Sequence, residues 1–248
     1  MVLANPEPVD PPADTDWHRR VVDRSLRTAR QRSIDRGSAL IRAAATLLER
    51  SDGDGFTVQE VADEAGQSLR TLYQFFESKD DLLLAVFEEA MRTYADLIRA
   101  AIEPLEDPLE RLAGAVMAAA AMPRRSRSGL NQGLTHLRLK LSEVEPELVG
   151  RSQAPLTQLF DELVEAAAAR GRIDPDDRAS ATFLLLSLNT AANTSLTLGN
   201  DVGTRQPEPA ELARFCLQGL GASVKPAWLS SVESRLRLRA PRSKAAPR

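Results

Sequence analysis

The chain has 248 residues and a formal net charge of −3, and 43% of its residues are hydrophobic and 27% charged. A chain of this length and composition can bury a sizeable core in one or two domains. Its single cysteine, Cys216, excludes an internal disulfide framework, and no stretch approaches the roughly 20 apolar residues of a membrane span. The N-terminus lacks the basic start and apolar core of a signal peptide, so we expect a cytoplasmic protein. Scarce aromatic residues, abundant Ala, Leu and Arg, and the lack of β-branched runs favour an all-α fold.

Charge is distributed unevenly along the chain. Residues 18–36 carry seven Arg against two Asp, a net of +5, and residues 225–248 carry seven Lys or Arg against one Glu, a net of +6. Residues 37–224 between them hold 18 basic and 28 acidic residues, a net of −10. Because phosphate attracts Lys and Arg, contacts with nucleic acid are expected at the two basic ends.

The N-terminal segment is rich in Arg. Residues 1–16 are rich in Pro and Asp and are expected to be disordered. Residues 17–36 suit either a short helix with an apolar side or a mobile arm, and the density of Arg favours the arm. We therefore assign residues 1–32 to a disordered leader and Arg-rich arm, which either follows DNA phosphates or is merely solvated. The basic residues of this arm are Arg19, Arg20, Arg24, Arg27, Arg30, Arg32 and Arg36.

Residues 57–79, TVQEVADEAGQSLRTLYQFFESK, have the pattern of a helix-turn-helix. Three hydroxyl residues stand where helices could begin, namely Thr57, Ser68 and Ser78. The first and third are followed three residues later by an acid, as in a capping box, and Gly66 suits the end of the first helix. A preceding helix is expected from about Ser33 to Arg50. Together these elements predict a three-helix DNA-binding domain over residues 33–80, whose last helix can lie in the major groove.

The segment LIRAAATLLER…FTVQEVADEAGQSLRTLYQFFESKDDLL resembles the N-terminal DNA-binding domain of TetR-type (TetR/AcrR) transcriptional repressors. The most specific part is the pattern T-V-x-x-V-A-x-x-A-G-x-S-x-x-T-L-Y-x-x-F-x-S-K-x-x-L. The resemblance implies base contacts from Leu69, Arg70 and Tyr73 and phosphate contacts from Thr57, Thr71 and Lys79. The helical spacing agrees, because an inward Leu72 and Phe76 would turn the first three outward, and Arg can donate bidentately to guanine O6 and N7. The alternatives are a packing role for Tyr73 and a solvated Lys79.

Two features depart from the family pattern. Phe75 stands where relatives often carry a Tyr or His that can bond to phosphate. Residues 37–82 hold four basic residues against nine acids, a net of −5, which is a poor electrostatic footprint for a DNA-binding unit. Both departures strengthen the case for DNA contacts from the segment 18–36.

The rest of the chain shares only its architecture with the family. Apolar residues at helical spacing predict further helices at about 79–101, 108–122, 130–144, 147–169, 175–198 and 208–220. We assign residues 81–224 to a helical ligand-binding and dimerisation domain. Residues 225–248 are taken as a basic C-terminal tail with room for one or two amphipathic turns.

The resemblance implies a small-molecule pocket in this body and a homodimer built from its last two helices. Candidate pocket residues, each with ordinary core packing as the alternative, are Met91, Tyr94, Met117, Met122, His136, Leu137, Phe160, Phe183, Asn189 and Asn193. Candidate interface residues, whose small or apolar side chains allow close four-helix packing, are Ala181, Leu185, Ala192, Leu212 and Leu220. The polar run from Asn189 to Ser195 suits either a ligand or hydrogen bonds across the dimer, and we favour the dimer.

The sequence contains no HxxxH, CxxC, GxSxG or phosphate-binding glycine motif, so we expect no enzyme activity, cofactor or metal. The prediction is a dimeric, sequence-specific transcriptional repressor that a mostly apolar small molecule releases from a palindromic operator. A constitutive DNA-binding dimer is one alternative. A helical binding protein or enzyme that does not act on DNA is another.

Overall fold

The protein is all-helical, as predicted, wherever its structure is described. The computed structural model describes residues 16–51, 56–125, 129–144, 146–175, 177–199 and 205–237, and every regular element in these ranges is an α-helix. Among these residues, no helix combines the length and apolar character needed to cross a membrane. Residues 1–15, predicted to be disordered, lie outside the described ranges.

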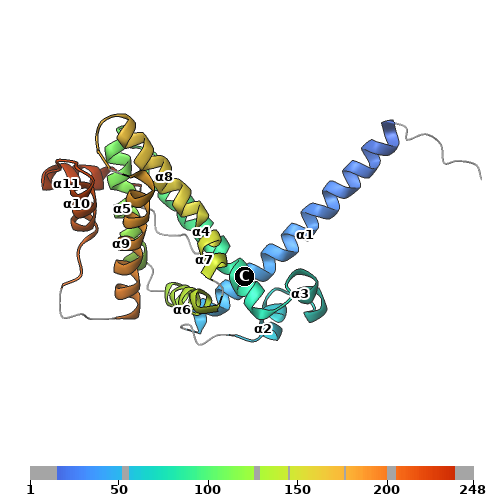
Figure 1. Cartoon of the computed structure of the whole chain (residues 1–248). Coiled ribbons are helices and arrows are strands. Elements are labelled where there is room, and N and C mark those ends of the chain that lie inside the picture. Colours follow the sequence, from blue (N-terminus) through green and yellow to red (C-terminus); the bar gives the residue numbers. More distant parts are fainter. Residues whose placement is uncertain are drawn as a thin grey trace, which may run out of the picture.

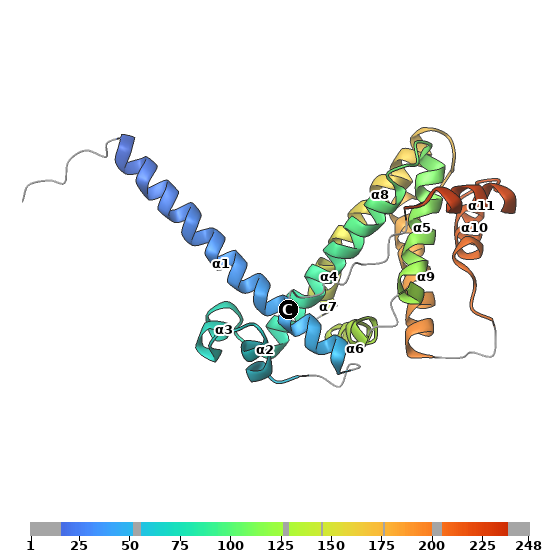
Figure 2. The same ribbon diagram turned by 180° about the vertical axis from the view of Figure 1, so that it is seen from behind.

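The first helix, α1, is far longer than the sequence led us to expect. It spans Asp16–Arg50, 35 residues, whereas we predicted a helix from about Ser33 and favoured a mobile arm before it. That prediction was wrong, because Arg is a good helix former and no Gly or Pro interrupts residues 16–36. Asp16 adds ion pairs in the first turn with Arg19 (3.6 Å) and Arg20 (4.0 Å). The N-terminal half of α1 therefore projects from the molecule as a helix (Figures 1 and 2).

The predicted caps of the helix-turn-helix are confirmed. They begin α2 (Val58–Glu64), α3 (Leu69–Phe75) and α4 (Lys79–Ile102). Thr57 and Glu60 form a complete capping box. At the start of α4 only half of the predicted box forms. The Ser78 hydroxyl accepts from the Asp81 amide (3.1 Å), but the Asp81 carboxylate accepts from the amide of Glu77 (3.0 Å).

The turn between α2 and α3 depends on the left-handed backbone of Gly66 (φ 64°). A Cβ at this position would meet no atom within 4 Å, so the penalty for another residue is purely one of backbone conformation. Gly66→Ala should lower the free energy of unfolding by about 1–2 kcal/mol, read as a lower Tm in calorimetry. Gly150→Ala is the matched control, since Gly150 also has free space around its Cβ position but lies in a helix without positive φ. The control should be neutral or stabilising, and an equal loss in both variants would contradict the argument.

Seven helices follow α4 in the described part of the chain. They are α5 (Pro108–Arg125), α6 (Gly129–Val144), α7 (Pro146–Ser152), α8 (Ala154–Ala169), α9 (Arg178–Leu198), α10 (Pro209–Gly219) and α11 (Pro226–Arg235). The Ala-rich α5 lies at the centre and packs against α4, α8, α9 and α10 (Figure 1). The single helix predicted at about 147–169 is divided into α7 and α8, because Pro155 at the start of α8 lacks a backbone N–H.

The predicted C-terminal tail is partly a structural element. Helix α11 buries Leu229 and Val232 in the core of the body. The Arg235 guanidinium donates to both carboxylate oxygens of Glu110 (2.5 and 3.0 Å), and the Arg237 amide donates to the Ala101 carbonyl (3.0 Å). The assignment of residues 225–248 to a tail was therefore wrong for residues up to Arg237. The basic residues that follow lie outside the described ranges.

Two hydrophobic clusters meet along α4. The first half of α4, from Leu82 to Met91, packs with α1, α2 and α3, and α6 and α7 contribute to the same cluster. The second half, from Ala95 to Ile102, packs with α5, α8, α10 and α11. Helices α4 and α6 therefore connect the helix-turn-helix directly to the body.

Candidate DNA-binding surface and ligand cavity

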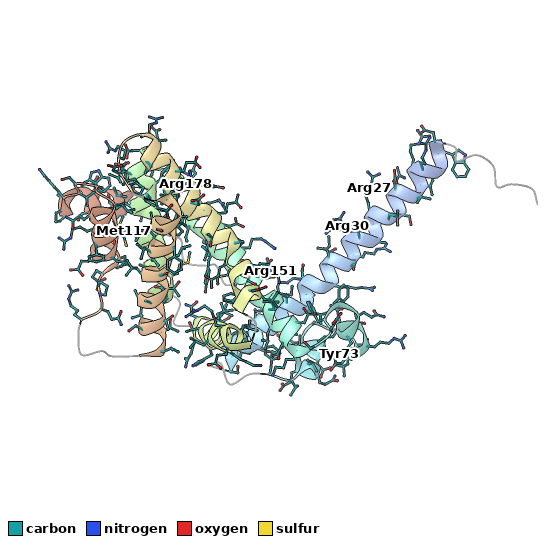
Figure 3. All side chains as sticks on the ribbon, in the orientation of Figure 1. Arg27, Arg30, Tyr73, Met117, Arg151 and Arg178 are labelled. Carbon is teal, nitrogen blue, oxygen red and sulfur yellow. The ribbon has the colours of Figure 1, made fainter. Side chains whose placement is uncertain are left out.

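Helix α3 presents the three predicted base-reading residues on its outer side. Leu72 is fully buried beneath the helix. Arg70 is exposed, Tyr73 is 52% exposed, and Leu69 is partly exposed. These positions, i, i+1 and i+4 of one short helix, share one face. Figure 3 shows Tyr73 at the outer end of the unit. Their placement leaves a guanidinium, a phenol ring and an aliphatic side chain free to meet base edges.

The structure brings together two of the three predicted phosphate-binding residues. The Lys79 ammonium donates to the Phe56 carbonyl, which belongs to the peptide group between Phe56 and Thr57. The same ammonium lies 5.0 Å from the centre of the Phe56 ring. Lys79 thus stands beside the N-cap of α2. The Thr57 hydroxyl donates to the Glu60 carboxylate (2.8 Å), and the hydrogen bond from the Thr57 amide lowers the pKa of that carboxyl. Thr71 lies apart on α3, where its hydroxyl is hydrogen-bonded to Ser68 (2.8 Å).

Two residues that were not predicted to contact α1 hold helix α3 and the turn before it against that helix. The Gln67 side chain donates to the Arg36 carbonyl of α1 (2.9 Å). Phe75, noted only as unable to bond to phosphate, packs over α1, since a Cβ on Gly37 would lie 3.5 Å from its ring. Gly37 inside a helix, three residues before the buried Leu40, was the available signal for this close approach. Phe75 therefore orients α3.

The predicted basic residues of residues 18–36 lie on the projecting half of α1, where every side chain from Arg19 to Arg36 is exposed. Figure 3 shows Arg27 and Arg30 on this half. Helical spacing places five of the seven arginines on one side of α1, and these are Arg19, Arg20, Arg24, Arg27 and Arg30. Within the described residues, no carboxylate pairs with Arg24, Arg27 or Arg30. The helix thus offers a row of unneutralised cations.

A cavity of about 140 Å³ lies between α4, α5, α6, α8 and α9. Six of the predicted pocket residues line it, namely Met91, Tyr94, Met122, Phe160, Asn189 and Asn193. Met117 and Leu137 are instead packed in the two hydrophobic clusters, and His136 is exposed. Phe183, 68% exposed, lines a neighbouring open groove of about 1270 Å³ between α7, α8 and α9. These four were wrong as walls of the cavity.

Polar side chains of α6 and α9 gather at this cavity. The Tyr94 hydroxyl donates to the Asn131 side chain (2.5 Å), and burial raises the pKa of Tyr94 to about 12, which keeps the phenol neutral. Arg138 donates to the Thr194 hydroxyl (3.2 Å), and burial lowers the pKa of its guanidinium. Asn131 and Arg138 were not predicted as pocket residues, although Asn131, Thr135 and Arg138 form a polar stripe at positions i, i+4 and i+7 of α6.

The polar run on α9 faces inward more than expected. Asn189 is buried, and its amide nitrogen donates to the Leu185 carbonyl (3.2 Å). The Asn193 amide nitrogen donates to the Ala119 carbonyl of α5 (3.2 Å). Both line the cavity together with Thr190 and Thr194. The amide nitrogens of Asn189 and Asn193 thus bond within the chain, and both side chains are placed at the cavity.

Most predicted interface residues lie inside a single chain. Four of them, Ala181, Leu185, Leu212 and Leu220, are buried in the core of the body, and Ala192 packs against that core. The four buried side chains face the core of their own chain, including α5, whereas Ala192 is only partly buried. The large apolar side chains that α9 and α10 expose are Phe183, Leu184 and Phe215.

Two comparisons with known proteins match the helix-turn-helix region of the chain. Residues 40–86 match the profile of bacterial regulatory proteins of the tetR family. Over 88 residues the chain is 35% identical to the HTH-type transcriptional regulator HbdR of Aromatoleum sp. (strain CIB), a match that covers 36% of this chain and 38% of that protein. The chain therefore spans less than two-fifths of the curated relative.

Solved structures share the fold over most of the chain. RolR in complex with resorcinol has a TM-score of 0.60 at 19% identity, covering 88% of this chain and 98% of RolR. FadR of Bacillus subtilis in complex with stearoyl-CoA has a TM-score of 0.59 at 16% identity, covering 76% of this chain and 99% of FadR. Over residues 40–86 the chain is thus similar to the bacterial regulatory proteins of the tetR family, and over most of its length it shares the all-helical fold of these solved structures.

Proposed function

We propose that the protein is a dimeric, sequence-specific transcriptional repressor that leaves a palindromic operator when a small molecule enters the cavity of its body. In this proposal residues 33–80 read DNA, and the helices from α4 onward bind the ligand and the second subunit. The observation that carries it is that two walls of the cavity, α4 and α6, also complete the core of the helix-turn-helix.

Helix α4 provides the first connection between the two sites. Met91 and Tyr94 line the cavity, and Lys79 begins the same helix beside the N-cap of α2. Any shift of α4 caused by a ligand therefore reaches a predicted phosphate contact within one rigid element.

Helix α6 provides the second connection. Its backbone packs closely on α1, since a Cβ on Gly133 would lie 3.4 Å from the Leu48 side chain. Lys140 pairs with Asp80 in the first turn of α4 (2.7 Å). A ligand that binds better to a conformer with differently placed reading helices would shift the population away from the DNA-bound form.

The solved structures support the ligand-binding part of the proposal. RolR was solved with resorcinol and FadR with stearoyl-CoA, so proteins of this fold hold small molecules. In a twofold dimer, the two α3 helices would lie about one DNA turn, or 34–36 Å, apart and face successive major grooves. A palindromic operator follows from that symmetry.

The test uses the full chain and labelled DNA from the region upstream of its own gene. Fluorescence anisotropy with excess competitor DNA should give a specific complex, and footprinting should show protection of a palindrome. A small molecule that raises the Tm of the protein should weaken that complex. Failure to protect any palindrome upstream of its own or neighbouring genes would overturn the proposal.

The row of arginines on α1 makes a separate prediction. The double variant Arg24→Gln, Arg27→Gln should weaken operator binding and reduce its salt dependence. The slope of log K against log salt should become shallower by about 1.8 for each subunit whose α1 contacts DNA. Arg151→Gln with Arg170→Gln, two exposed arginines of the body, is the matched control and should leave the slope unchanged. Equal slopes for both double variants would show that α1 does not touch phosphate.

A further inference from the structure

One end of the cavity carries a cation without an acidic partner. Arg138 is half-buried, and the only partner of its guanidinium within the described residues is the Thr194 hydroxyl. A guanidinium has five N–H donors, so one hydroxyl leaves most of them unused. Among the described residues no Asp or Glu lines the cavity, and the one acid that lines the adjoining groove, Asp161, pairs with Arg178 (3.4 Å). The charge of this end suits an anion.

A second polar residue of the cavity offers an acceptor. The Asn189 amide nitrogen donates to the Leu185 carbonyl, and this partner fixes the orientation of the amide because a carbonyl can only accept. The Asn189 Oδ1 is buried and accepts no hydrogen bond within the described residues. A ligand group that donates a hydrogen bond here would satisfy it, whereas a carboxylate would be repelled.

The space between the two groups is small and mostly apolar. The cavity is partly open, and its volume of about 140 Å³ is close to the roughly 150 Å³ of an engineered cavity that binds benzene. Asn189 and Thr194, the hydroxyl partner of Arg138, lie five residues apart on α9, which is about 7.5 Å along the helix axis. The apolar part of the lining includes Phe87, Met91, Leu134, Leu156 and Phe160.

We infer that the cavity binds a small organic acid with one ring, whose carboxylate pairs with Arg138 and whose hydroxyl, across the ring, donates to Asn189. This inference rests on the proposed function, because it names the chemical class of the effector for the same cavity. It differs from resorcinol, the ligand of RolR, in requiring a carboxylate.

The probes are 4-hydroxybenzoate, benzoate, which lacks the donor, and phenol, which lacks the acid. Isothermal titration of the full chain should give 4-hydroxybenzoate at least a tenfold lower Kd than either of the others. Arg138→Gln should remove the preference over phenol and leave phenol binding itself unchanged. Asn189→Leu should remove the preference over benzoate.

Arg138→Lys, which keeps the charge, should retain a preference for the acid, and circular dichroism should confirm that every variant is folded. Phenol binding as tightly as 4-hydroxybenzoate, no binding of any probe, or an Arg138→Gln variant that keeps the full preference would overturn the inference. Operator binding without ligand is measured separately. If the wild-type protein did not bind the operator, the proposed repressor function would be overturned, while the titrations would still decide the ligand class.

Discussion

The double variant Leu184→Glu, Phe215→Glu is expected to be a folded monomer whose operator affinity is lower by a factor of about 10²–10⁴, the gain that linking two binding heads provides. Both side chains are mostly exposed in the single chain, at 56% and 67%, and they lie on α9 and α10, which both pack on α5. Burial of a large apolar side chain contributes about 1.5–3 kcal/mol. Each position occurs twice in a twofold interface, so burial of these four side chains should stabilise the dimer by about 6–12 kcal/mol.

The readouts separate assembly from folding. Light scattering after size exclusion gives the mass, circular dichroism the helix content, and anisotropy the operator affinity. Leu97→Glu with Leu139→Glu, two exposed leucines on α4 and α6, is the matched control and should remain dimeric. A dimeric Leu184→Glu, Phe215→Glu variant would show that the subunits meet elsewhere.

The DNA-reading unit could be predicted closely because its determinants are local. Thr57, Ser68 and Ser78 each accept a hydrogen bond from an amide three residues on, and the buried Leu72 fixes which side of α3 faces outward. Capping and helical periodicity act over a few residues, so they can be read from the sequence.

Helix α9 has two apolar faces. One, with Ala181 and Leu185, packs in the core of its own chain. The other, with Leu184 and Ala191 seven residues apart, is exposed. Periodicity finds both faces but cannot tell which one meets α5, because that depends on helices distant in the sequence.

The prediction of a mobile arm in place of the projecting half of α1 was wrong for a physical reason. Repulsion between exposed arginines is weak in water, whereas helix propensity acts at each residue of an uninterrupted segment. The arginines that precede the acidic helix-turn-helix therefore lie on its own first helix, where helical spacing places five of them on one side. The cavity was predicted in part. The sequence pointed to its apolar walls, but Arg138 becomes informative only when the absence of an acid beside it is known.

Arg70→Ala should abolish discrimination between the operator and unrelated DNA at one position of each half-site. A bidentate contact from Arg to guanine contributes about 1–3 kcal/mol of discrimination, and the two subunits double this to about 2–6 kcal/mol. Arg70 is exposed at the start of α3 and makes no ion pair within the described residues, so its removal should not destabilise the fold. Anisotropy with the operator and with a scrambled duplex at fixed salt measures the ratio of the two affinities.

Three further variants define what Arg70 does. Arg70→Lys keeps the charge but loses the paired donors, so it should retain phosphate attraction and lose most of the discrimination. Arg42→Ala, an exposed arginine on α1, should leave the ratio unchanged. Tyr73→Phe should have a smaller effect, because only the hydroxyl is lost. If Arg70→Ala weakened operator and scrambled DNA equally, Arg70 would be a phosphate contact, and base reading would have to rest on Leu69 and Tyr73.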